Sequence, residues 1–292
     1  MIPNRRQFIK TASAGLAITA ISGSIMGCMP SGTGNGEKLD AFGIQLYTLR
    51  DVLPANPKEI LKQVAAMGYN QIESYEGDNG MFWGMGNQGF KSYMDDLGMK
   101  IIASHCGIDD QFERKTAEAA AIGMRYLIVP SVNPLKNLDH VKRIADQFNK
   151  AGEICKKAGL RFAYHNHDYS FKLLEGEYPQ DVMMNNTDPE LVDYEMDIFW
   201  VETAGEDSLK WFEKYPNRFK LCHIKDRSKN TNASAEPQSC VLGEGEIDLK
   251  KILKAAKKAG MQYYFAEQEH YGGSSPLQAS KQNADYLKAI LI

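Results

Sequence analysis

Two histidines stand either side of an asparagine in the stretch YHNHDY, residues 164–169, which follows the apolar run GLRFA. A neutral imidazole can carry protons near pH 7 and can also bind divalent metals. The stretch therefore has three interpretations: part of a metal site, a polar cluster that orients a substrate, or two histidines that merely close a strand. The choice depends on which side chains the other strands of the fold place close to these histidines.

Strand parity indicates which side chains share a face, because alternate residues of a strand point to opposite sides. Ala163, His165 and His167 therefore share one face of their strand. Most of the expected strands carry polar or ionisable residues of one parity toward their C-terminal ends. These residues are Gln45, Tyr47, Glu73, His105, His165, His167, Asp193, Glu195, Asp197, His223, Lys225, Glu267 and Glu269. Burying so many ionisable groups costs free energy unless a cation, a substrate or mutual pairing compensates.

A divalent metal is the compensating species that these residue types favour. Asp197, His223 and Glu267 come from three successive expected strands and offer two carboxylates and one imidazole. That mixture suits Mn²⁺, Mg²⁺ or Zn²⁺ rather than a soft, thiolate-bound metal. The alternative is an ion-paired network, in which Asp197 pairs with Lys225 or Glu267 pairs with His223.

A short internal repeat indicates which elements position these residues. Gly68, Gly98, Gly123, Gly159 and Gly260 each follow the end of an amphipathic helix and precede one apolar residue, one polar residue and a β-branched or aromatic run. Glycine there supplies the left-handed conformation that ends a helix. The runs are typical of parallel strands, which are buried on both faces.

Three further strands are expected in AFGIQLYTLR, LVDYEMDIFW and RFKLCHIKD, which begin at residues 41, 191 and 218. Helices are expected near residues 57–67, 87–97, 112–122, 137–158, 179–186, 206–214, 247–259 and 275–290. Eight strand–helix units in about 250 residues predict a single (β/α)8 TIM barrel over residues 40–292, with its site at the C-terminal mouth of the strands. An open doubly wound sheet is the alternative, but no glycine-rich dinucleotide fingerprint follows the first strand.

Composition narrows the class of partner. The chain has 292 residues, of which 43% are hydrophobic and 24% charged, with a net charge of −3. No block of lysine and arginine is present, so nucleic acid is not an expected partner, because phosphate neutralisation needs clustered cations.

The N-terminal residues have the character of an export signal. NRRQFIK is followed by TASAGLAITAISGSIMG, which is too short and too mildly hydrophobic for a membrane span of roughly 20 apolar residues. The pattern resembles a twin-arginine signal that ends in a lipoprotein box, IMGC. We expect residues 1–28 to be this signal, a lipid anchor on Cys28, a flexible linker over residues 29–39, and a location in the periplasm or cell envelope. An uncleaved anchor is the alternative. The remaining four cysteines match no zinc spacing.

Several stretches together resemble the xylose-isomerase-like superfamily, and most closely its sugar phosphate isomerase/epimerase branch, over residues 41–292. They are GIQLYTLRD, YHNHDYSF, NTDPELVDYEMDIFWV, HIKD, VLGEGEIDLKKIL and YYFAEQE. The resemblance implies a (β/α)8 barrel with one divalent metal, held by acidic residues that end strands five, six and eight and a histidine that ends strand seven. Asp197, His223 and Glu267 match three of these positions.

The fifth-strand position departs from the pattern, because His165 stands where epimerases of the superfamily have a glutamate. Such epimerases exchange a proton between two carboxylates on opposite faces of the substrate. The histidine-rich strand is more similar to the inosose dehydratase branch. His165 is then the expected fourth metal ligand, and Glu73 or Glu175 is a possible source of the missing carboxylate.

Three functions stay open at this point. The first is a metal-dependent isomerase or epimerase that acts by enolisation on an unphosphorylated sugar or keto-sugar. The second is a lyase or dehydratase of 3-keto sugars or glycosides, and the third is a lipid-anchored, non-catalytic sugar-binding barrel. A phosphorylated substrate is disfavoured by the export signal and by the lack of a basic cluster or glycine-rich loop.

The two enzymatic functions suggest a role for each candidate residue. We expect Glu267 or His165 to act as the base, and Lys225 or His167 to stabilise charge or act as the acid. The residues expected to contact the substrate are Gln45, Glu73, His105, Trp200 and Glu269.

Overall fold

A computed structural model describes residues 37–39, 41–229 and 236–292 of the chain. The expected signal segment, Cys28 and linker residues 29–36 lie outside these described residues. The last linker residues do not hang free, because the backbones of Glu37 and Ile292 exchange two hydrogen bonds of 3.0 and 2.9 Å. Within the described ranges, no helix is long and apolar enough to cross a membrane.

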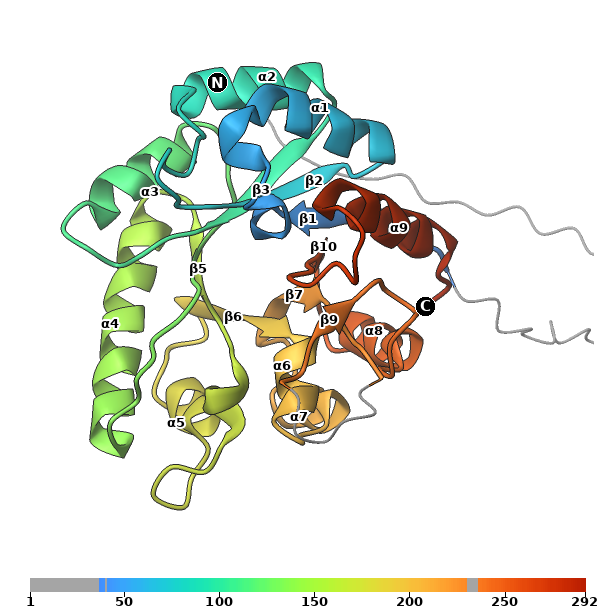
Figure 1. Cartoon of the computed structure of the whole chain (residues 1–292). Helices are drawn as coiled ribbons and strands as arrows, with labels where there is room; N and C mark the ends of the chain where they lie inside the picture. Colours follow the sequence, from blue (N-terminus) through green and yellow to red (C-terminus); the bar gives the residue numbers. More distant parts are fainter. Residues whose placement is uncertain (1–36, 40, 230–235) are drawn as a thin grey trace, which may run out of the picture. The chain divides into compact units, whose positions relative to one another are not determined.

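Eight parallel strands close into a barrel in the order β1-β10-β7-β6-β5-β4-β3-β2 (Figure 1). The strands are β1 Gly43–Gln45, β2 Gln71–Tyr75, β3 Lys100–His105, β4 Tyr126–Val129, β5 Arg161–His165, β6 Val192–Asp197, β7 Phe219–Ile224 and β10 Tyr263–Ala266. The predicted (β/α)8 barrel is therefore confirmed.

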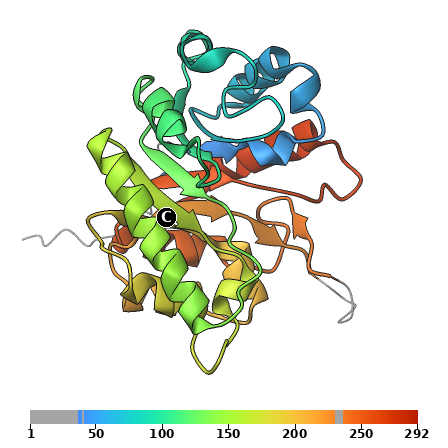
Figure 2. The ribbon, with the colours of Figure 1, turned by 90° about the vertical axis from the view of Figure 1, so that its left-hand side faces the viewer.

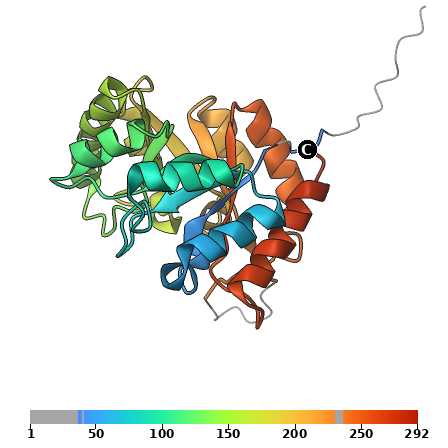
Figure 3. The ribbon, with the colours of Figure 1, turned by 90° about the horizontal axis from the view of Figure 1, so that it is seen from above.

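The helices lie outside the strands (Figures 1 and 3). They are α1 Pro57–Met67, α2 Gly86–Asp96, α3 Phe112–Ala120, α4 Leu138–Lys157, α5 Pro179–Asn185, α6 Ile198–Thr203, α7 Ser208–Lys214, α8 Leu249–Lys258 and α9 Pro276–Ala289. All except α6 match an expected helix. Figure 2 shows α4, which has 20 residues and packs along β5.

Helix α1 illustrates how the repeat builds one unit. Asn56 caps its first turn by accepting the N–H of Glu59, and Gly68 ends it with φ +98°. Ile60, Leu61 and other buried apolar residues at helical spacing form the face that packs inward. The chain then passes through one short turn into β2, as the repeat predicts.

The barrel interior changes from apolar to ionisable along the strands. Ala103, Ala163, Leu221 and Phe265 belong to one buried apolar cluster. Each lies two positions before an ionisable residue of the same strand, so each faces the same way one layer lower. The apolar layer therefore lies directly below His105, His165, His223 and Glu267.

Several expected strands end earlier than predicted. Strand β5 ends at His165 and β10 at Ala266, so His167, Glu267 and Glu269 lie beyond the strands on which they were expected. Two other strands end where a helical turn begins. The sixth was expected to reach Trp200, but β6 ends at Asp197, whose side chain accepts the N–H of Trp200 at 3.2 Å and starts α6. The first ends at Gln45, so Tyr47 lies in the 3₁₀ helix η1, Leu46–Leu49, instead of on a strand. In both cases a polar side chain at the strand end caps a helical turn, and this competes with further extension.

A hairpin not expected from the sequence follows β7. Its strands are β8 Asp226–Arg227 and β9 Ser239–Cys240, paired antiparallel. The side chain of Asp226 accepts the backbone N–H groups of Gly243, Gly245 and Ile247, which ties the hairpin to the segment before α8.

Candidate metal centre and active site

Ionisable side chains from six strands meet at the C-terminal mouth of the barrel. They are Glu73, His105, His165, Glu195, Asp197, His223, Lys225 and Glu267, and all of them are buried. Seven of them fall into two clusters that share His223, and Lys225 belongs to neither cluster. We call His165, Asp197, His223 and Glu267 the upper group, and Glu73, His105, Glu195 and His223 the lower group.

The upper group has the composition and spacing of a metal site. Its four potential ligand atoms lie within 4.8 Å of one another. Nδ1 of His223 is 3.1 Å from Oε2 of Glu267 and 3.7 Å from Oδ2 of Asp197. Nε2 of His165 is 3.4 Å from the same Asp197 oxygen. Two imidazoles and two carboxylates are a ligand set that Zn²⁺ and Mn²⁺ accept.

The tautomer of His165 strengthens this fit. Its Nδ1 lies 3.2 Å from the carbonyl oxygen of Pro130 and can only donate there, so Nε2 carries a lone pair. Burial, followed by the charge of His223, lowers the pKa of His165 to about 4, which keeps the ring neutral at pH 7. Nε2 is buried without a hydrogen-bond partner among the described residues. A lone pair that faces a carboxylate oxygen is repelled unless a cation lies between them, so the residues fit a divalent metal.

Lys225 adds an internal cation beside the upper group. Its Nζ lies 2.8 Å from Glu267 Oε2, 2.8 Å from Glu269 Oε1 and 3.3 Å from Asp197 Oδ2. Burial opposes its charge, but attraction to Asp197 and Glu267 is stronger and raises its pKa. Both ion pairs of the alternative network, Asp197 with Lys225 and Glu267 with His223, are thus present beside the candidate ligands.

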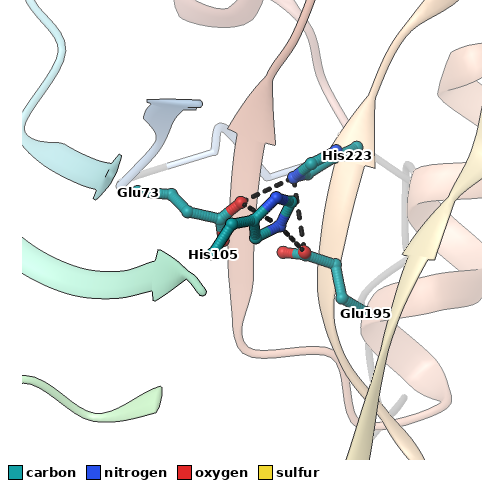
Figure 4. A group of neighbouring side chains, drawn as sticks. All are labelled: Glu73, His105, Glu195 and His223. Atoms are coloured by element: carbon teal, nitrogen blue, oxygen red, sulfur yellow. Dashed lines mark hydrogen bonds and ion pairs between the residues drawn. The ribbon is translucent and has the colours of Figure 1, made fainter. Parts of the chain in front are cut away.

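The lower group lies deeper and is joined by hydrogen bonds (Figure 4). Nε2 of His105 is 2.9 Å from Glu195 Oε2 and 3.0 Å from Glu73 Oε1, and Nε2 of His223 is 2.7 Å from Glu73 Oε1. Burial and the charge of Glu73 raise the pKa of Glu195 to about 8. Burial opposes a charge on His105, but the nearby carboxylates raise its pKa to about 9.

Glu195 was expected among the polar residues of shared parity but was given no role in the site. It has the same strand parity as Asp193 and Asp197, and that parity was the available signal. Asp193 shares this face but lies at the other end of the strand, where it pairs with Arg161 at 2.7 Å and accepts from Tyr126 at 2.9 Å.

A cavity of about 450 Å³ opens above the two groups. Its lining residues are Tyr47, Tyr75, Glu76, His105, Cys106, Gly107, Pro130, Ser131, His165, His167, Trp200, Glu267 and Glu269. Of the residues expected to contact a substrate, His105, Trp200 and Glu269 line this cavity. Tyr75 was not predicted, although it lies two positions after Glu73 on β2 and so has the same parity.

Two expected substrate contacts lie below the cavity instead. Gln45 and Glu73 are both fully buried, are hydrogen-bonded to each other, and are absent from the lining. Glu175, considered as a source of the missing carboxylate, accepts the backbone N–H of Leu138 at 2.9 Å and does not line the cavity.

His167 lies at the cavity wall as the residue before the 3₁₀ helix η3, Asp168–Phe171. Its ring stacks on Tyr169 with an interplanar angle of 6° and lies 5.3 Å from the ring of Trp200. Burial, followed by the charge of His165, lowers its pKa to about 3. Its buried Nδ1 has no hydrogen-bond partner among the described residues. His167 is therefore a neutral imidazole with free bonding capacity beside the cavity.

The family model for the xylose isomerase-like TIM barrel matches residues 61–290. The chain belongs to this family. Membership agrees with the barrel and with the resemblance found in the sequence.

Individual relatives point to carbohydrate chemistry. The chain is 28% identical over 167 residues to an inosose dehydratase of Clostridium perfringens. The matched segment covers 52% of this chain and 55% of that protein. The chain thus spans about half the length of the curated relatives it matches. A solved sugar phosphate isomerase/epimerase from Parabacteroides distasonis is 28% identical, with a TM-score of 0.73 over 89% of this chain and 96% of that one.

A third relative carries a metal. The solved IOLI protein contains a bound zinc atom and superposes with a TM-score of 0.66 at 14% identity, over 84% of this chain and 95% of that one. At that identity the likeness concerns the fold alone.

Proposed function

We propose that this protein is a divalent-metal-dependent enzyme that enolises an unphosphorylated keto-sugar and then eliminates water or an aglycone from it. The observation that carries the proposal is the upper group directly beneath the cavity, with the unprotonated Nε2 of His165 aimed at Asp197. His165 Nε2, Asp197, His223 Nδ1 and Glu267 would hold the metal. When bound, such a metal polarises a substrate oxygen and stabilises negative charge that develops on it.

The cavity lining supports an unphosphorylated substrate. None of its described lining residues is lysine or arginine, and Lys225 is buried among three carboxylates. Phosphate recognition relies on such cations or on a cradle of backbone N–H groups. Tyr47, Tyr75 and Trp200 instead supply aromatic surface, while the histidines and glutamates supply polar groups that bind hydroxyls.

His167 is the proposed proton carrier. Its neutral ring accepts the proton from the carbon next to the ketone, and the electron pair of that C–H bond passes into the enolate. The enolate then expels the oxygen on the neighbouring carbon, which takes the proton back from the imidazolium. Burial lowers the pKa of His167 and keeps its ring neutral at pH 7, so the ring can accept a proton. No outside oxidant or reductant is required.

Epimerisation of the kind described above uses two carboxylates on opposite faces of the substrate. The described lining residues near the upper group offer no such free pair, and this favours elimination. Glu267 is engaged by Lys225 and His223, and the fifth-strand position holds His165. The inosose dehydratase relatives support the same outcome over the matched half of the chain. The sequence alone ranked isomerisation first, so this proposal reverses that order.

Epimerisation or isomerisation is the second candidate. It is favoured by the likeness to the sugar phosphate isomerase/epimerase of Parabacteroides distasonis, which extends over most of both chains. Enolisation is common to both candidates, which differ in what happens to the enolate.

Turnover in D₂O separates the candidates. The purified chain, loaded with Mn²⁺ or Zn²⁺, is incubated with 3-keto-glucose and a 3-keto-glucoside, and the products are analysed by mass spectrometry and NMR. Loss of water or aglycone supports elimination, whereas deuterium in a recovered epimer without eliminated product supports epimerisation. Sugar binding without turnover, unaffected by EDTA, would instead favour the non-catalytic binding barrel.

We also propose that the chain is exported and anchored by a lipid on Cys28. The support is the sequence of residues 1–28, with its paired arginines and the IMGC box. An envelope location suits free sugars and glycosides as substrates better than cytoplasmic sugar phosphates.

A further inference from the structure

His223 is shared by the two groups, and its two ring nitrogens face different partners. Nδ1 lies 3.1 Å from Oε2 of Glu267 in the upper group. Nε2 lies 2.7 Å from Oε1 of Glu73 in the lower group, a contact that Figure 4 shows. The side chains of His223 and Glu73 are both fully buried. Since the proposed metal takes Nδ1, the Nε2 contact determines how the imidazole is presented to it.

A neutral imidazole has a single N–H, and the partner of one nitrogen decides which nitrogen carries it. Oε1 of Glu73 can only accept when the carboxylate is ionised, so it selects the tautomer with hydrogen on Nε2. A metal at Nδ1 would displace the hydrogen that this nitrogen shares with Glu267, and the Nε2–H would stay on Glu73. Glu195 is a weaker candidate for this task, because its Oε2 is 3.4 Å from His223 Nε2 and 2.9 Å from His105 Nε2.

Glu73 is itself held in place from below. Nε2 of Gln45 donates to Oε1 of Glu73, and Oε1 of Gln45 accepts the backbone N–H of Tyr47 at 3.0 Å. Gln45 and Glu73 are also register partners on the adjacent strands β1 and β2. A rigid chain of hydrogen bonds thus runs from β1 through β2 to the imidazole on β7.

The lower group resembles a second metal site by composition, but its short contacts are typical of a hydrogen-bonded cluster. His223 already offers Nδ1 to the proposed metal of the upper group. A second cation in the lower group would also need the lone pair of Nε2, so the ring would have to lose both of its N–H hydrogens. The contacts His223–Glu73 and His105–Glu195 instead have ordinary donor–acceptor distances of 2.7 and 2.9 Å. In the upper group the corresponding atom, Nε2 of His165, has no hydrogen to donate.

We propose that Glu73 is a positioning residue of the metal centre, which holds the Nε2–H of His223 so that Nδ1 faces the metal. The inference rests on the proposed metal site. It replaces the substrate contact expected of Glu73 with a role beneath the cavity. Carboxylates that orient a ligating histidine in this way typically affect metal affinity by about 10- to 100-fold.

The test measures metal affinity of the full chain by competition with a chromophoric chelator, using Zn²⁺ or Mn²⁺ alone. E73L removes the acceptor, E73Q keeps an oxygen acceptor of the same reach, and E195Q is the matched control in the same buried group. We expect one equivalent of metal in the wild type, about 10- to 100-fold weaker binding in E73L, partial recovery in E73Q, and little change in E195Q.

A spectroscopic readout separates positioning from general destabilisation. In ¹⁵N-histidine-labelled, Zn²⁺-loaded protein, two-bond ¹⁵N–¹H correlations should show His223 protonated at Nε2 and ligated at Nδ1, with this signature lost or mixed in E73L. E73Q and the wild-type spectrum keep the test valid if E73L fails to fold.

Three results would overturn the inference: unchanged affinity in E73L, an equal loss in E195Q, or two metal equivalents of which E73L loses one. A wild type that binds no metal would instead remove the proposed function on which the inference rests.

Discussion

Nε2 of His165 lies 3.4 Å from Oδ2 of Asp197, while the other nitrogen of the same ring donates to the carbonyl of Pro130. The two facing atoms both carry lone pairs, because donation to Pro130 fixes the tautomer. This arrangement is costly in a buried site and becomes favourable once a cation binds both atoms. Protein stability should therefore depend on metal.

Metal removal should lower the melting temperature. A ligand that binds only the folded state at a hundredfold excess over its Kd adds about 2.7 kcal/mol of stability. We expect dialysis against EDTA to lower Tm in differential scanning fluorimetry, and added Mn²⁺ or Zn²⁺ to restore it. In H165A the metal-dependent shift should be much smaller. Equal Tm values for metal-free and metal-supplied wild type would contradict the proposed centre.

Replacing Lys225 should destabilise the metal-free protein strongly. In K225M, three carboxylates lose a buried cation, and breaking a buried ion pair by removing one partner costs about 3–5 kcal/mol. Urea denaturation gives the loss, and added metal should recover part of it by neutralising Asp197 and Glu267. The control K214M removes an exposed partner of Asp181 and should cost at most about 1 kcal/mol. Equal losses in both variants would refute the internal-cation role.

Stability of the metal-free protein should fall as pH rises from about 6.5 to 9. The pKa of His105 is raised to about 9 in the folded state, so its stabilisation is fully present below the unfolded value of 6.5 and is lost as pH passes through 9. Glu195, with its pKa raised to about 8, contributes in the same direction between pH 4.5 and 8. Unfolding free energies at pH 6, 7.5 and 9 measure the effect.

The variant H105N supplies the control for this pH dependence. A raised pKa of one unit corresponds to about 1.4 kcal/mol, so the His105 contribution is on the order of a few kcal/mol. H105N should flatten the profile between pH 6.5 and 9. A wild-type stability that rises over this window would show that the lower group does not retain its protons.

Parity reasoning predicted much of the site because it needs only the strand period. It put Asp197 in the same set as His223 and Glu267, whereas His167, expected on the same strand face as His165, follows the end of β5. The sequence could not give the depth of each side chain along the barrel, because that depth is set by the register between neighbouring strands. Two register irregularities decide it here, one between Ile72 and Glu73 and one between Tyr194 and Glu195.

The first irregularity sets Glu73 opposite Ala103 and Tyr75 opposite His105. Glu73 therefore falls one layer below the cavity, and Tyr75 reaches its wall. The second sets Glu195 opposite Leu221 and Asp197 opposite His223. A bulge has no reliable sequence signature, which is why Glu73 was expected at the substrate and Glu195 was given no role.

Replacing His167 should abolish turnover while leaving the metal centre intact. His167 lines the cavity but is outside the upper group, so H167N should lower kcat by about 10²–10⁴-fold with unchanged metal content. H140N, on α4 and away from the cavity lining, is the control and should retain activity. Full activity in H167N would assign the proton transfer to another residue.

Export and lipidation should be separable by two substitutions at the N-terminus. In a host with twin-arginine export, C28A should move the protein from the membrane fraction to the soluble fraction, because the lipid attachment site is lost. Replacing Arg5 and Arg6 together with lysine should block export. Mass spectrometry of the N-terminal peptide identifies the lipid, and a wild-type chain with an unmodified Cys28 would refute the anchor.

Asp197 uses its two carboxylate oxygens for different purposes, Oδ1 for the N–H of Trp200 and Oδ2 for His165 and Lys225. The start of α6 and the proposed metal centre therefore both depend on the side chain of Asp197. Trp200 lines the cavity, and its backbone N–H is bound by Asp197. Metal binding at Asp197 should therefore change the surroundings of the indole. Trp200 is one of the three tryptophans of the chain, so comparison with W200F would show how much of a fluorescence change on metal loading comes from this ring.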